Sequence, residues 1–240
     1  MDELCERLRA ATSVLVLTGS GISAESGLPT FRGTGGLWRT HRVEELASPQ
    51  GFARDPRLVW TWYNERNAVH RQAQPNAGHY ALAALEQRIS DFTLATQNVD
   101  SLHMRAGSHR LLELHGSLRT ARCTGCEQRR PLDSLGLPLD AIEHACGGRF
   151  RPDIVWFGEP LPSAVWGSAV EAAARAEVIV VVGTSAVVYP AAALATHYAG
   201  DAFVAEINPE PTAISERVDC LLRGTAAEVL PRIVESLLRR

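Results

Sequence analysis

The 240-residue chain has little of what membrane-spanning and secreted proteins contain. Its longest apolar run, VIVVVG at 178–183, is far too short to cross a bilayer. Its first residues, MDELCERLRAA, are charged and amphipathic, without the apolar segment of a secretion signal. Hydrophobic residues make up 45% and charged residues 21%, as in ordinary globular proteins. We therefore expect a cytoplasmic protein without a membrane partner.

Charge and cysteine content argue against two further classes. The formal net charge of −3 argues against nonspecific binding to nucleic acid, and we expect no specific nucleic-acid partner. Five cysteines, an odd number in a chain of this length, do not suggest a disulfide framework. Three of the five lie within 123–146, which makes that segment a candidate metal site.

Apolar, β-branched runs alternate with helical patterns along most of the chain. Buried strands are predicted at 14–19, 92–98, 110–116, 178–185 and 203–211, and helices at 2–11, 55–73, 78–88, 164–176 and 226–240. This order predicts an α/β fold with a doubly wound, parallel, Rossmann-like sheet. Between 119 and 150 the apolar runs stop and cysteine, arginine and glycine become frequent, so we expect a small inserted module there.

Polar or glycine-rich turns follow four of the predicted strands. They are TGSGISAESG, TQNVDSLH, LHGS and GTSAVVYP. Because the carboxyl ends of parallel strands meet at one edge of a sheet, we expect a ligand crevice at that edge. The GSG of the first turn is a weak signal alone, because it lacks the full G-x-G-x-x-G pattern. It is compatible with a pyrophosphate cradle and equally with a tight turn that binds no ligand.

Six blocks of this sequence resemble those of the sirtuins, which are NAD-dependent protein-lysine deacylases. The blocks follow the family's order between about residues 14 and 231: TGSGISAESGLPTFRGTGGLW, TQNVDSLHMRAGS, ELHGS, RPDIVWFGE, GTSAVVYPAA and EINPEPT. The resemblance implies an NAD-binding Rossmann-like domain (1–40, 85–118 and 151–240), a helical insert within the small domain (41–84), and a zinc-ribbon-like module (119–150) that lacks one cysteine of the family pattern.

The resemblance also implies a reaction and a partner. The reaction is NAD-dependent removal of acyl groups from protein lysines, with release of nicotinamide and O-acyl-ADP-ribose, and the partners are acyl-lysine proteins or peptides. Two alternatives remain open on the same scaffold: an ADP-ribosyltransferase or NAD hydrolase, and a noncatalytic NAD sensor. The products distinguish them, because only deacylation yields O-acyl-ADP-ribose. The sequence carries no indication of the oligomeric state.

Residue roles follow from the matched blocks. His115 matches the family's catalytic base, and Asn98 and Asp100 are the other candidate catalytic residues. Ser101 replaces a usual glycine, and a serine there is strained if the position needs a positive φ. The resemblance places the cofactor against Gly19, Ser20, Gly21, Ser23, Glu25, Phe31, Arg32, Trp38, Gln97, Asn98, Val99, Asp100, Gly183, Thr184, Ser185, Asn208, Pro209, Glu210 and Ala226.

Tyr63 and Arg66 are the candidate substrate-binding pair. Residues three apart on a helix share a face, so the phenol and the guanidinium can enter one pocket. Within the sirtuins this Tyr-x-x-Arg pair resembles the class that accepts succinyl- or malonyl-lysine. Arginine offers a forked donor to a terminal carboxylate. The alternative is an aromatic core position beside an exposed arginine.

The candidate metal site contains Cys123, Cys126 and Cys146 and lacks a fourth cysteine. The first two have the C-x-x-C spacing that zinc favours, whereas the position three before Cys146 is Glu143. His144 is the other nearby donor, and imidazole is a common ligand in Cys3His zinc sites. Three outcomes remain open: a structural zinc held through His144, a module without metal, and a site that uses Glu143.

Overall fold

The computed structural model describes residues 1–30, 43–136 and 142–239. Its larger sheet is six-stranded and parallel, in the order β3-β2-β1-β7-β8-β9. The order reverses between β1 and β7, which is the doubly wound arrangement and confirms the predicted Rossmann-like class. The strands are β1 (Ser13–Thr18), β2 (Asp91–Thr96), β3 (Leu111–Glu113), β7 (Val178–Val182), β8 (Phe203–Ile207) and β9 (Cys220–Leu222).

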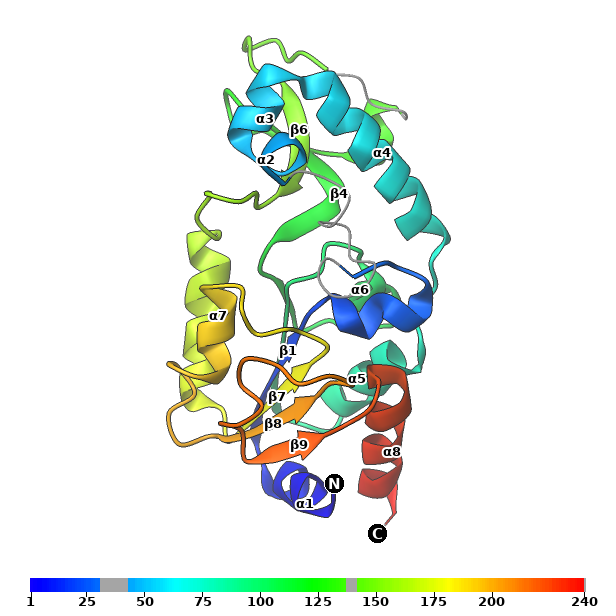
Figure 1. Ribbon diagram of the computed structural model, residues 1–240, viewed down its shortest axis with the longest axis vertical. Helices are drawn as coiled ribbons and strands as arrows, with labels where there is room; N and C mark the ends of the chain where they lie inside the picture. Colours follow the sequence, from blue (N-terminus) through cyan, green and yellow to red (C-terminus); the bar gives the residue numbers. More distant parts are fainter. Residues whose placement is uncertain (31–42, 137–141, 240) are drawn as a thin grey trace.

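Helices cover both faces of this sheet (Figure 1). One face packs against α1 (Asp2–Ala10), α5 (Ala77–Glu86) and α8 (Ala226–Leu238). The other face packs against α7 (Ser163–Arg175) and the 3₁₀ helix η4 (Ala191–Ala195). Among the described residues no helix combines the length and the apolar character that a membrane span requires.

Strand β1 shows why the apolar run forms a central strand. Val14 and Val16 pack into the core on the α1–α5–α8 face, and Leu15 and Leu17 into the core on the α7 face. A parallel strand covered on both faces buries every side chain, so its sequence is continuously apolar rather than alternating.

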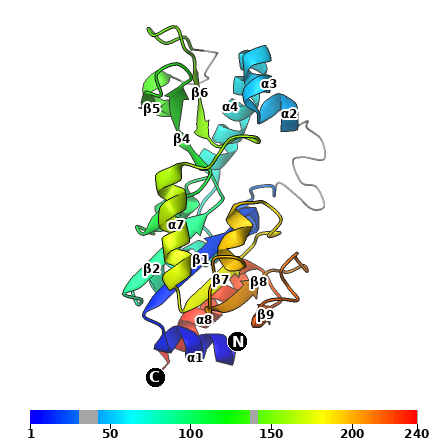
Figure 2. The ribbon, with the colours of Figure 1, turned by 90° about the vertical axis from the view of Figure 1, so that its left-hand side faces the viewer.

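A second, antiparallel sheet forms the small domain with strand order β5-β4-β6. Figures 1 and 2 show this sheet and α2–α4 together at the end of the molecule away from both termini. The elements are α2 (Val43–Leu46), α3 (Pro49–Arg54), α4 (Pro56–Gln72), β4 (Gly116–Cys123), β5 (Arg129–Pro131), η3 (Leu132–Leu135) and β6 (Phe150–Ile154). Strands β4 and β6 extend beyond 119–150 at both ends. The domain boundaries stay a prediction.

Helix α4, which carries the candidate substrate pair, is capped at its start and hydrogen-bonded to β6. Asp55 caps its first turn, because its Oδ1 accepts the N–H of Leu58 at 3.0 Å, and Pro56 occupies the first helical position. Val59, Trp60 and Tyr63 lie on its buried face. Trp60 donates its Nε1–H to the carbonyl of Phe150 at 3.0 Å, which ties the helix to β6.

Two short helices follow the strand ends of the large sheet. The 3₁₀ helix η1 (Ser20–Ser26) follows β1, and α6 (Leu102–Arg105) follows the turn after β2. Ser101, just before α6, has φ 67° and ψ 11°, the left-handed conformation. The position therefore needs the positive φ at which glycine is the residue without strain.

We expect Ser101→Gly to stabilise the protein by about 0.5–1 kcal/mol. The left-handed conformation costs a non-glycine residue about 1–2 kcal/mol, and the extra freedom of glycine in the unfolded chain offsets part of the gain. Urea unfolding followed by circular dichroism measures the change. Ser163→Gly, at the first residue of α7 where φ is negative, is the matched control and should give no gain. An unchanged or lower stability for Ser101→Gly would contradict the assignment of strain.

Candidate functional site

A cleft of about 590 Å³ lies between the carboxyl edge of the parallel sheet and the small domain. The predicted residues that line it are Gly19, Ser20, Gly21, Glu25, Tyr63, Arg66, Gln97, Asn98, Val99, His115, Gly183, Thr184, Ser185, Asn208, Pro209, Glu210 and Ala226. Ser23 and Asp100 are not among the lining residues. Phe31, Arg32 and Trp38 lie outside the described residues.

The loops after β1 and β7 meet backbone to backbone. Gly21 donates its N–H to the carbonyl of Gly183 at 2.7 Å, and Gly19 donates to Val182 at 3.1 Å. A Cβ on Gly19 would lie 2.7 Å from the Thr184 Cβ, and one on Gly21 would lie 2.7 Å from the Gly183 Cα. Packing within the protein therefore requires both glycines, whatever ligand enters the cleft.

A hydrogen-bonded cluster orients Asn98. Its Nδ2 donates to the carbonyl of Gly19 at 3.1 Å and to Ser23 Oγ at 3.2 Å. Ser23 Oγ in turn donates to Asp100 Oδ2 at 2.7 Å, and Asp100 Oδ1 accepts the Leu102 N–H at 2.9 Å. Burial raises the pKa of Asp100, and these two hydrogen bonds oppose the rise. Asp100 thus acts on the cleft through Ser23 and Asn98.

His79 belongs to the same cluster, although sequence reasoning missed it. Its Nδ1 accepts the backbone N–H of Asn76 at 3.2 Å as part of a capping box at the start of α5. The ring proton therefore resides on Nε2, which lies 3.4 Å from Ser23 Oγ and donates to it. Burial lowers the pKa of His79 to about 4, so the ring is neutral. The only signal in the sequence is the capping pattern, which does not indicate the link to Ser23.

His115 lines the cleft with a defined tautomer. Its Nδ1 lies 3.0 Å from the carbonyl oxygen of Gln97. Because a carbonyl oxygen only accepts, Nδ1 carries the proton and Nε2 holds a free lone pair. Burial lowers the pKa of His115 below its ordinary value, and the bond to Gln97 opposes part of that shift. The imidazole is therefore a neutral base at pH 7.

The end of the cleft formed by the small domain is lined by aromatic side chains and by the cation of Arg66. Tyr63 is buried, and the Arg66 guanidinium lies over the Trp62 ring at 4.7 Å from its centroid. Burial lowers the pKa of Arg66 to about 10, so it stays charged at neutral pH. Both members of the Tyr-x-x-Arg pair line the cleft, and Arg66 is half-buried rather than exposed. Their role in binding substrate stays a prediction.

Another part of the cleft wall comes from residues 154–159, which sequence reasoning left without a role. Ile154, Val155, Trp156, Phe157 and Glu159 all line the cleft. They belong to the RPDIVWFGE block, so the sequence marked the segment. It did not show which side chains turn inward.

Four thiol and imidazole groups gather at the far end of the small domain. The ligand atoms of Cys123, Cys126, His144 and Cys146 all lie within 4.8 Å of one another. The His144 Nδ1 lies 3.1 Å from the Cys146 Sγ and 3.5 Å from the Cys126 Sγ. Zinc bonds of about 2.0–2.3 Å in a tetrahedron place donors about 3.3–3.8 Å apart, so the set fits a structural zinc ion.

Glu143 is not part of that cluster. Its side chain is exposed and pairs with Arg149, with 3.4 Å between Oε1 and Nη2. The backbone turns at this point, since His144 accepts and donates backbone bonds with Gly147 and Gly148. Of the two candidates for the fourth ligand, the structure brings only His144 to the cysteines.

The sequence profile of the Sir2 family matches residues 19–190. The chain belongs to the Sir2 family. NAD-dependent protein deacylase 2 of Pyrobaculum aerophilum is 51% identical over 239 residues, which cover 99% of this chain and 96% of that protein. A Sir2 homologue solved as a complex with NAD is 44% identical, with a TM-score of 0.92 over 100% of this chain and 94% of that chain. A Sir2 structure with a p53 peptide and NAD+ is 30% identical, with a TM-score of 0.85 over 98% of this chain and 97% of that chain.

In this Sir2-family site we expect His115 to titrate below pH 6.5 as the Nδ1–H tautomer. The neutral form is favoured by burial, so protonation requires more acid than for an ordinary histidine with a pKa of about 6.5. ¹⁵N NMR of the imidazole, assigned with His115→Gln, reports both quantities. A midpoint above 6.5, or an Nε2–H tautomer, would contradict the geometry.

We also expect the purified protein to contain about one equivalent of zinc, measured by inductively coupled plasma mass spectrometry. His144→Ala removes a ligand and should lower the content by more than half. Glu143→Gln, next to it in the chain and outside the cluster, is the matched control and should leave the content unchanged. Less than a tenth of an equivalent in the wild-type protein would rule out the site.

Proposed function

We propose that the protein is an NAD-dependent protein-lysine deacylase that prefers acyl groups ending in a carboxylate, succinyl and malonyl, and also accepts acetyl. The observation that carries the proposal is that Tyr63 and Arg66 line the same cleft as His115. The names of the relatives support the general activity, because the Pyrobaculum aerophilum protein is called a deacylase and another Sir2 structure contains a p53 peptide.

The cleft offers acceptors that suit the hydroxyl and amide groups of NAD. Asn98 is 5% exposed, and its Nδ2 donates to the Gly19 carbonyl and to Ser23 Oγ. In the described part of the chain its Oδ1 accepts no hydrogen bond. His115 Nε2, which carries no proton in this tautomer, is a second acceptor in the cleft. Gly19, Ser20, Gly21 and Glu25 after β1, with Gln97, Ser185, Asn208 and Glu210, would hold the cofactor. Bound NAD supplies an activated ribose carbon from which nicotinamide can depart.

Within this proposal the residues of the chain have distinct tasks. His115 Nε2 removes a proton from a hydroxyl presented in the cleft, a contribution of roughly 10²–10⁴-fold to the rate. Asn98 orients the amide or hydroxyl group that it accepts from. Asp100 and Ser23 hold Asn98 in place. The antiparallel domain shapes the acyl end of the cleft. A zinc ion held by Cys123, Cys126, His144 and Cys146, none of which lines the cleft, would stabilise that domain.

The acyl preference follows from the chemistry of the donors. Arg66 stays charged and can bind a carboxylate with two parallel N–H donors. Tyr63 adds a hydroxyl donor beside it. An acetyl group has no carboxylate to accept these bonds, so the pair contributes to succinyl- and malonyl-lysine alone.

We expect Arg66→Met to lower the ratio of kcat/KM for succinyl-lysine to kcat/KM for acetyl-lysine by about 10- to 100-fold, because a charge-assisted hydrogen bond is worth about 1.5–3 kcal/mol. NAD-dependent assays with a peptide panel, read by mass spectrometry for O-acyl-ADP-ribose, measure the ratio. The chain contains no lysine, so every acyl-lysine signal comes from the added peptide.

Arg71→Met is the matched control for that experiment. Arg71 lies on the same helix, is exposed, and pairs with Asp133 outside the cleft. The ratio should not change in this variant. Equal loss of both activities in Arg66→Met would contradict the acyl preference. Free ADP-ribose or ADP-ribosylated protein as the main product would instead favour the hydrolase or transferase alternative.

A further inference from the structure

Trp156, which follows β6, is held at its face, its backbone and its edge. It is 2% exposed. The guanidinium carbon of Arg151 lies 3.3 Å from the centroid of its ring, and Glu159 Oε2 accepts its backbone N–H at 2.8 Å. The ring of Phe52 lies 5.4 Å away at a tilt of 46°. With these contacts the indole has one orientation.

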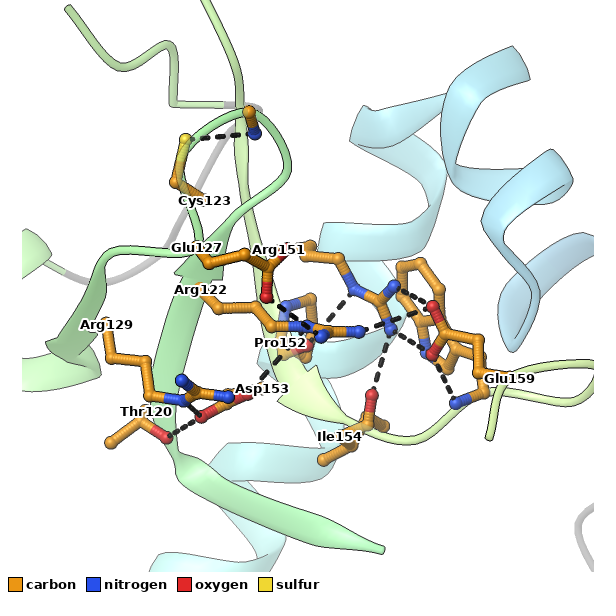
Figure 3. Close-up of polar contacts among 12 residues, drawn as sticks. Thr120, Arg122, Cys123, Glu127, Arg129, Arg151, Pro152, Asp153, Ile154 and Glu159 are labelled. Carbon is orange, nitrogen blue, oxygen red and sulfur yellow. Dashed lines mark hydrogen bonds and ion pairs between the residues drawn. The ribbon is translucent and has the colours of Figure 1, made fainter. Parts of the chain in front are cut away.

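The two groups that hold Trp156 also hold each other. Arg151 binds Glu159 through its two terminal guanidinium nitrogens, at 2.5 Å from Nη1 to Oε1 and 2.9 Å from Nη2 to Oε2. Arg122 Nη2 lies 3.3 Å from the same carboxylate, and Figure 3 shows both arginines pointing at Glu159. Arg151 is 4% exposed and also donates to the carbonyl of Ile154 at 2.9 Å. A forked, buried pair of this kind has a fixed geometry.

The fixed indole presents its edge to Tyr63. Trp156 Nε1 lies 3.0 Å from the Tyr63 hydroxyl oxygen. An indole N–H only donates, so the phenol oxygen accepts in this bond and the hydroxyl hydrogen is left over. Within residues 1–30, 43–136 and 142–239 no acceptor for that hydrogen is found, although Tyr63 is buried and lines the cleft. Burial raises the pKa of Tyr63 well above its usual range, so the hydrogen stays in place.

We infer that Trp156 is a positioning residue for acyl selectivity, which directs the Tyr63 hydroxyl hydrogen into the cleft toward an acyl carboxylate. The indole N–H occupies one side of the phenol oxygen, and the hydroxyl hydrogen turns away from it. Beside Arg66, that hydrogen becomes a second donor for the same carboxylate. This inference rests on the proposed function, because an acyl group without a terminal acceptor does not use the donor.

Trp156→Phe tests the inference, because it removes the N–H and keeps an aromatic ring over Arg151. The succinyl-to-acetyl ratio of kcat/KM should fall about 3- to 10-fold, in line with the loss of one neutral hydrogen bond. The fall should come from a higher KM for the succinyl peptide. Tyr63→Phe should lower the ratio at least as much. The double variant should equal Tyr63→Phe alone, because Trp156 acts only through the hydroxyl. Trp166→Phe, on α7 and outside the cleft, should leave the ratio unchanged.

A spectroscopic measurement separates this inference from the proposed function. ¹⁵N NMR resolves the indole N–H signals of the five tryptophans. The hydrogen bond to Tyr63 should shift the Trp156 signal downfield in the wild-type protein, and the signal should move upfield in Tyr63→Phe. This experiment needs neither substrate nor a folded Trp156→Phe variant. If the indole signal does not respond to Tyr63→Phe, or if the two ratio losses add in the double variant, the inference is overturned. A ratio unaffected by Arg66→Met, with the indole shift present, overturns the proposed function instead.

Discussion

The backbone contact between the loops after β1 and β7 positions the reacting end of the cleft. At Gly183 φ is 58°, and a Cβ there would lie 2.5 Å from the Ile22 nitrogen, so this contact leaves no room for a side chain. The next residue, Thr184, accepts the Gln97 Nε2 at 3.1 Å. The backbone carbonyl of the same residue, Gln97, accepts a hydrogen bond from His115 Nδ1. The base is thus linked through two residues, Gln97 and Thr184, to the glycine contact.

The reacting groups and the selecting groups lie on different parts of the molecule. Asn98 and His115 follow β2 and β3, where parallel strands end at one edge. Tyr63 and Trp156 come from α4 and the segment after β6, which pack together in the core of the antiparallel domain. The cleft forms where these two bodies meet. Changes that alter acyl preference therefore need not disturb the hydrogen bonds that orient the base.

The sequence was sufficient for the fold, and most of the site residues that it predicted line the cleft. A buried parallel strand demands a continuous β-branched run, and the end of that run locates the polar edge. His79 and Trp156 were not predictable in their roles, because each depends on a contact across more than fifty residues with a single polar atom. The glycines illustrate the opposite case. Gly19 and Gly21 were assigned to a ligand, and the geometry shows that packing between loops requires them first.

All 24 positions that hold lysine or arginine in this chain hold arginine. Lysine acylation, the modification on which the proposed reaction acts, therefore has no side chain to attack on the protein itself. The choice also suits the architecture around Trp156. Arg151 makes two parallel bonds to one carboxylate while its plane stacks on the indole. A lysine ammonium group is not planar and cannot make two parallel hydrogen bonds to one carboxylate, so lysine could not replace Arg151 there. The same absence that protects the surface from acylation thus coincides with a buried geometry that only arginine can form.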